Sequence, residues 1–190
     1  MNIENPQYIL LMKVGPYCGY SLEEIISIKM MEEKKIGKFF WGYSGVFCRP
    51  NILQNFVSHA HSNNQNIKVM FTHTMSSYIG TNVDRFGKFS SDGSNWKDIP
   101  REVLLVGTKN KPHFAITGKN LEKVDIKLDL SQYCSISGIF VNEERYLDEY
   151  FRYRVDKACG YYLPRANIKE KIVDISYISD FVDPFSVYIK

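Results

Sequence analysis

The chain has 190 residues with 44% hydrophobic residues, which suits one folded domain with a sizeable core. Its net charge of +3 is far from the dense positive charge of a dedicated nucleic-acid binder. The sequence contains no apolar run of the roughly 18 residues that a membrane helix needs, and its start lacks the basic region of a signal peptide. We therefore expect a soluble, cytoplasmic protein.

The first 75 residues predict strands and helices that alternate with short connections. An apolar run over 7–14 has strand length. Ser21 and Glu24 form a capping box that begins a helix, and Gly37 suits its end. The patterns that follow predict a strand over 38–43, a helix over 49–63 and a strand over 66–74. This β-α-β-α-β order implies crossovers and at least partly parallel pairing.

The second half of the chain is less regular. Residues 75–100 predict an insertion, in which an Asp-Gly turn between Phe89 and Trp96 favours a hairpin or a lid. The remaining patterns predict strands over 102–108, 113–118 and 123–133, a helix over 142–159, and one or two strands in the tail, interrupted at Pro184. The whole pattern indicates a single α+β domain over 1–190, with an α/β-like first half, a mixed sheet and room for a ferredoxin-like core.

The stretch "GKFFWGYSGVFCRP" (37–50) is the main candidate for a ligand site. A strand, a glycine turn and a helix start in this order would leave backbone N–H groups free to bind an anion, with an arginine fork beside them. Trp41 and Tyr43 could stack on a base. Their alternation with Phe39 on one face of the strand favours core packing as the alternative. The candidate ligand-binding residues are Trp41, Gly42, Tyr43, Gly45, Arg49 and, further on, Arg154.

Two more positions complete the candidate site. His73 lies at the carboxyl end of the predicted strand over 66–74, the end that lines the ligand crevice in open α/β sheets. It is the candidate catalytic acid or base, and a packed structural histidine is the alternative. Arg154 shares the apolar face of the predicted helix over 142–159, which favours an anionic ligand, whereas a solvated, ion-paired face is the alternative.

Other chemistries find less support in the sequence. His59 and His61, with four scattered cysteines, fit no zinc module, so we expect no metal and no cofactor. Cys48 lies beside an arginine near a predicted helix start, which lowers a thiol pKa, but no partner base can be named. The sequence has no Walker A loop, Rossmann glycine pattern, Gly-x-Ser-x-Gly elbow or paired His-x-Thr motif.

Three segments, "GKFFWGYSGVFCRP", "FSSDGSNWKDIP" and "YRVDKACG", together resemble a family of poorly characterised bacterial and phage proteins of similar length. This resemblance spans most of the chain and implies no particular activity. The β-α-β-β-α-β-like order of the first half, with its strand-Gly-Tyr-Gly passage, is also similar to the small phage S-adenosylmethionine lyases. That similarity implies a ferredoxin-like fold and a homo-oligomer with its active site between subunits. It also implies that the enzyme cleaves its ligand without a metal ion or a water molecule.

Three functions follow as hypotheses. The first is an enzyme that acts on an adenosine-like or nucleotide-derived molecule, such as a lyase in phage or bacterial defence. The second is a non-catalytic protein that binds and sequesters such a nucleotide signal. Both predict an anionic or adenosine-like small molecule as the partner, with no membrane and no dedicated nucleic-acid binding. The third is an interaction module whose aromatic surface docks another protein.

Overall fold

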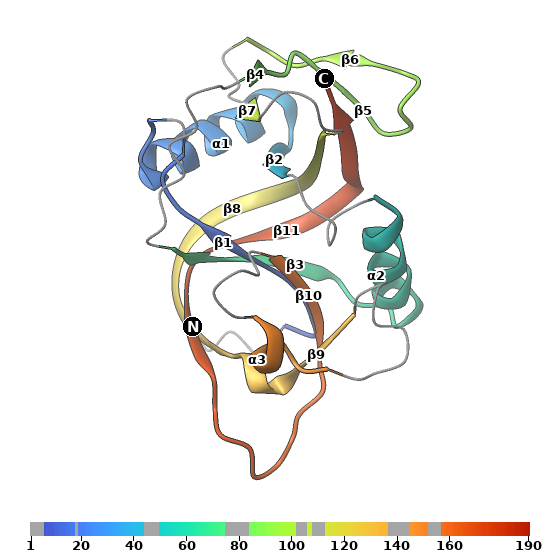
Figure 1. Ribbon diagram of the computed structural model, residues 1–190. Coiled ribbons are helices and arrows are strands. Elements are labelled where there is room, and N and C mark those ends of the chain that lie inside the picture. The colour runs from blue at the N-terminus through green and yellow to red at the C-terminus, as the bar shows by residue number, and fades with distance from the viewer. Residues whose placement is uncertain are drawn as a thin grey trace.

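A computed structural model of the chain describes residues 6–17, 19–43, 50–74, 84–101, 106–107, 113–136, 145–151 and 157–190. These residues form a single α+β domain around a mixed nine-stranded sheet (Figure 1). No helix in these ranges is long and apolar enough to cross a membrane.

The first part of the chain has the predicted order of elements, with bounds within one or two residues of the predicted ones. These elements are β1 (Tyr8–Val14), α1 (Leu22–Ile36), β2 (Phe39–Tyr43), α2 (Pro50–Ser62) and β3 (Ile67–His73). The later elements are β4 (Asp84–Arg85), β5 (Lys88–Ser90), β6 (Lys97–Asp98), β7 (Val106–Gly107), β8 (His113–Asp129), the 3-10 helix η2 (Leu130–Gln132), β9 (Tyr133–Ser135), α3 (Leu147–Tyr150), β10 (Lys157–Tyr162) and β11 (Ile172–Ile189).

The predicted capping box begins α1. The Ser21 hydroxyl accepts a hydrogen bond from the Glu24 N–H at 3.2 Å, and the Glu24 carboxylate accepts one from the Ser21 N–H at 2.7 Å. Lys34 and Lys35 lie in the last turn, where the helix dipole favours positive charge. Gly37 ends the helix at a φ of 76°, a left-handed conformation that glycine adopts without steric cost.

The sheet order is β2-β8-β11-β3-β1-β10-β9. Among the described strands, β1 and β3 form the one parallel pair, and this pair is the predicted crossover. β2 joins the opposite edge of the sheet through β8, so β8 and β11 separate it from β3. A ferredoxin-like split β-α-β unit has a strand between its two parallel strands, whereas β1 and β3 are direct neighbours here.

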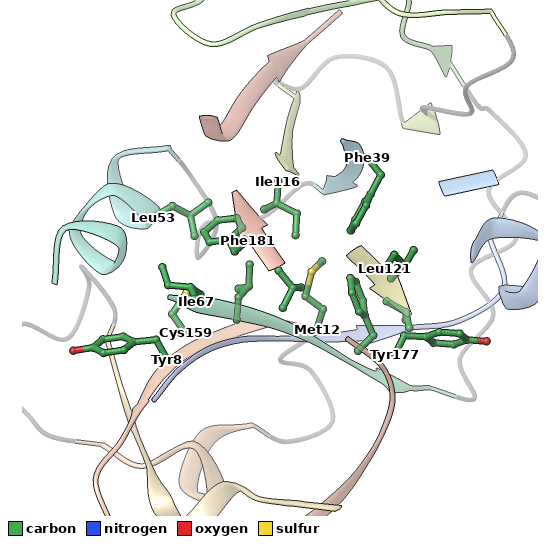
Figure 2. Packing of buried hydrophobic residues seen from close by; sticks show 14 of the residues in the cluster. Tyr8, Met12, Phe39, Leu53, Ile67, Ile116, Leu121, Cys159, Tyr177 and Phe181 are labelled. Carbon is green, nitrogen blue, oxygen red and sulfur yellow. The ribbon is translucent and has the colours of Figure 1, made fainter. Parts of the chain in front are cut away.

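Both faces of β1 and β3 are buried. On one face, Leu10 and Met12 pack with residues of α1, α2 and β2, and Figure 2 shows side chains of this cluster gathered over the two strands. On the other face, Ile9 and Leu11 pack with Leu147 of α3 and with residues of η2, β8 and β11. β8 and β11 are long, curved strands that pair along most of their length (Figure 1). β1 and β3 therefore separate two apolar clusters, and a third cluster includes Phe40, Ala115 and Val187 of β2, β8 and β11.

The predicted helix over 142–159 is wrong in its last part. α3 ends at Tyr150, and Lys157–Tyr162 forms β10, which pairs with β1 on one side and β9 on the other. The helical spacing of apolar residues was misleading, because hydrogen bonding to the open edge of β1 overrides a local periodicity. The argument for Arg154 assumed that this helix continued past residue 150, so it loses its basis.

Candidate functional site

The structure places only part of the predicted ligand site. Gly42 and Tyr43 belong to β2 and pair with Ala115 and Phe114 of β8. The predicted residues that lie outside the described ranges are Gly45, Arg49, Arg154 and, as the alternative nucleophile, Cys48.

Trp41 is partly buried and packs against the core. The centroid of its ring lies 4.9 Å from that of Phe71 on β3, with the rings inclined at 44°. It belongs to the same apolar cluster as Phe39, which is fully buried. This contact favours the core interpretation of Trp41 over stacking on a base.

His73 lies exposed at the carboxyl end of β3, as predicted, beside Val14 of β1. However, β2 runs opposite to β3, because three antiparallel steps through β8 and β11 connect the two strands. The carboxyl ends of β2 and β3 therefore belong to opposite ends of the sheet. His73 and Tyr43, which end these two strands, are therefore at opposite ends of the sheet, whereas sequence reasoning grouped them in one candidate site.

A cleft of about 390 Å³ is lined by residues of α2 and β11. Figure 1 shows α2 beside the bend of β11. α2 contributes one side of the cleft with Leu53, Gln54, Val57, Ser58 and His61. The other side is formed by residues 183–186 of β11 and by Ser91, which follows β5. Leu53 and Val57 are buried and give the cleft an apolar floor.

Most of the β11 side of the cleft comes from an irregularity in the sheet, residues 182–185, which we call the β11 bulge and of which 183–185 line the cleft. The pairing on β11 jumps from Phe181 to Ser186, while β8 advances past Thr117 alone. The bulge residues therefore leave the ladder and project toward α2. Bulges of this kind are common next to active sites, because they redirect side chains out of a regular sheet.

Thr117 of β8 anchors the backbone of the β11 bulge. This threonine is fully buried, and its hydroxyl lies within hydrogen-bonding distance of the main-chain carbonyl oxygens of Val182 and Pro184. The Lys38 ammonium group also donates a hydrogen bond to the main-chain carbonyl oxygen of Asp183 at 3.3 Å. The bulge is thus fixed through its backbone, and among the described residues the Asp183 side chain makes no contact there that would keep it from the cleft.

Five polar side chains that line the cleft have no hydrogen-bonding or ion-pair partner among the described residues. These side chains are Gln54, Ser58, His61, Ser91 and Asp183. All five are exposed to solvent. The His61 ring meets the Phe185 ring edge-on, with centroids 5.4 Å apart. An apolar floor, an aromatic pair and free polar groups suit a small ligand with a flat ring and several hydrogen-bonding groups.

His59 and His61 have different surroundings. His59 Nδ1 is hydrogen-bonded to the Tyr8 hydroxyl at 2.9 Å, whereas His61 faces the cleft. No group of three His, Cys, Asp or Glu side chains in the described ranges is placed to hold a metal ion.

Sequence reasoning missed this cleft, because α2 and residues 183–186 lie more than 100 residues apart in the chain. His61 drew attention only as half of a zinc pair, and Pro184 only as an interruption of a strand. The interruption was the available signal, since proline within a strand often marks a bulge.

Among the described residues, the most deeply buried charges lie elsewhere, between α1 and β2. The Lys29 ammonium group lies 2.8 Å from one carboxylate oxygen of Glu32, and the other oxygen accepts a hydrogen bond from the Phe40 N–H at 2.8 Å. Burial lowers the pKa of Lys29 and raises the pKa of Glu32. Because β2 is an edge strand among the described strands, Glu32 satisfies an N–H that no neighbouring described strand accepts.

No family model matches the chain, and no curated protein or solved structure matches it either. The resemblance to bacterial and phage proteins therefore stays a prediction.

Proposed function

We propose that the protein binds a small adenosine-like molecule in the cleft between α2 and the β11 bulge. The observation that carries this proposal is the set of uncommitted polar side chains around an apolar floor. The cleft volume of about 390 Å³ lies within the range of roughly 300–1,000 Å³ that is usual for small-molecule sites.

The groups on the cleft match the chemistry of a nucleoside. Phe185 and His61 provide aromatic surface for a purine ring. The Gln54 carboxamide offers both donors and acceptors to the edge of a base. The hydroxyls of Ser58 and Ser91 can bond to ribose oxygens, and the Asp183 carboxylate can accept from ribose hydroxyls or from an amine.

Cleavage of the ligand is a second candidate, and the free imidazole of His61 favours it. Histidine is the commonest general acid or base in enzymes, and this one faces the cleft. If the protein is a lyase, His61 is a better candidate than His73, which is not among the residues that line the cleft. A protein that only sequesters its ligand needs the same cleft without proton transfer.

A thermal-shift screen with adenosine, S-adenosylmethionine, nucleotides and cyclic oligonucleotides tests the proposal. A ligand at 100 times its dissociation constant should add about 2.7 kcal/mol to the free energy of unfolding. For a chain of this length, that gain raises Tm by roughly 5–10 °C. Chromatography of each stabilising ligand after incubation separates an enzyme from a binder. A screen in which no compound changes Tm would contradict the proposal and favour a protein-interaction module.

A further inference from the structure

We infer that Asp183 makes the cleft selective for an unphosphorylated ligand, neutral or positively charged. This inference rests on the proposed function and names the charge class of the ligand for the same site. The sequence predicted either an anionic or an adenosine-like molecule, and this inference keeps only the adenosine-like one.

The charge of the cleft is the first argument. The Asp183 carboxylate is exposed and forms no ion pair with any described residue. Lys38 donates to the main-chain carbonyl oxygen of Asp183, so it fixes the backbone and does not pair with the carboxylate. Among the described residues that line the cleft there is no Lys or Arg to receive a phosphate.

The anchored backbone that carries the carboxylate is the second argument. Asp183 lies in the middle of the β11 bulge, between the two carbonyl groups that the buried Thr117 hydroxyl faces. A charge on an anchored bulge acts on a bound ligand at a defined place, whereas a charge on a loose loop can move away. The Asp183 carboxylate therefore adds a negative charge to the lining of the cleft, whereas Lys38, which binds the Asp183 carbonyl oxygen, is not part of that lining.

The size of the expected effect follows from Coulomb's law. Two unit charges about 4 Å apart in water change an affinity by about fivefold, and partial exclusion of water increases this factor. A phosphate group beside Asp183 should weaken binding by at least this factor, and an ammonium group should strengthen it similarly. Added salt should reduce both effects, because the site is open to solvent.

A matched ligand series tests the inference: 5′-amino-5′-deoxyadenosine, adenosine and adenosine 5′-monophosphate share one nucleoside and differ in charge. Isothermal titration of the native protein at low ionic strength should give the tightest binding for the amine and the weakest for the phosphate. In Asp183→Asn, the affinities for the amine and for adenosine should become equal. Asp125→Asn removes an exposed charge from β8 outside the cleft and should leave the native order unchanged.

The outcomes separate the inference from the proposed function. If the phosphate binds as tightly as adenosine, or if Asp183→Asn keeps the native order, the inference is wrong while the cleft remains a nucleoside site. If none of the three compounds binds the native protein, the proposed function fails and the inference falls with it.

Discussion

Replacing Glu32 by alanine should lower the free energy of unfolding by about 3–5 kcal/mol. The carboxylate is fully buried and serves two donors, the Lys29 ammonium group and the Phe40 N–H. Without this carboxylate, the buried Lys29 ammonium group loses its Glu32 partner and the Phe40 N–H loses its acceptor. Because domains are typically stable by about 5–15 kcal/mol, this loss should be easy to measure by urea denaturation.

Two variants separate the buried pair from a general effect of losing a charge. Glu23→Ala removes an exposed glutamate from the first turn of the same helix and should cost less than about 1 kcal/mol. The double variant Lys29→Met/Glu32→Gln removes both charges and keeps an acceptor for the Phe40 N–H, so it should regain most of the lost stability. A loss below about 1 kcal/mol in Glu32→Ala, or no regain in the double variant, would show that the pair does not hold β2 to α1.

Replacing Gly118 by alanine should destabilise the protein by about 1–3 kcal/mol through overpacking. Gly118 lies opposite Phe39 on β2, and the fully buried Phe39 ring covers it. A methyl group at this position would lie 2.3 Å from Cζ of that ring, far inside van der Waals contact. The ring must therefore leave its place in the core, and the β2–β8 pairing must shift with it.

A double-mutant cycle with Phe39→Leu measures this clash directly. The smaller side chain should relieve part of it, so the double variant should be more stable than the sum of the two single effects by about 0.5–3 kcal/mol. Gly87→Ala is the matched control, since a methyl group there would have no atom within 4 Å, and its cost should be small. Strictly additive effects would contradict the packing of Phe39 over Gly118.

The first half of the fold was predictable because its signals are local. A capping box and a left-handed glycine set the ends of α1, and apolar runs of strand length gave β1 and β3. β10 was not predictable in the same way, because its conformation depends on pairing with β1, some 150 residues earlier in the chain. Local periodicity favoured a helix there, and the long-range hydrogen bonds decided against it.

The candidate site depends even more on distant contacts. The alternation of Phe39 and Trp41 correctly indicated a core strand, but the contact of Trp41 with Phe71 depends on β3, which lies some 30 residues later in the chain. The β11 bulge arises from the register between β8 and β11, and Pro184 signals an interruption of the strand without revealing that register. His61 becomes a candidate site residue only in the folded structure, where the bulge places Phe185 beside it.

The binding of adenosine or of the best compound from the screen to two tryptophan variants of α2 tests the proposed cleft most directly. Ser58 lines the cleft, is exposed and has no hydrogen-bonding partner in the described part of the chain, so Ser58→Trp should fill the cleft and keep the fold. Asn55→Trp adds the same side chain at an exposed position of the same helix, outside the described lining of the cleft.

We expect native affinity in Asn55→Trp and at least a tenfold loss in Ser58→Trp, which corresponds to about 1.4 kcal/mol, with similar unfolding transitions for both variants. Native affinity in Ser58→Trp would contradict the account, because the ligand would then bind elsewhere on the protein.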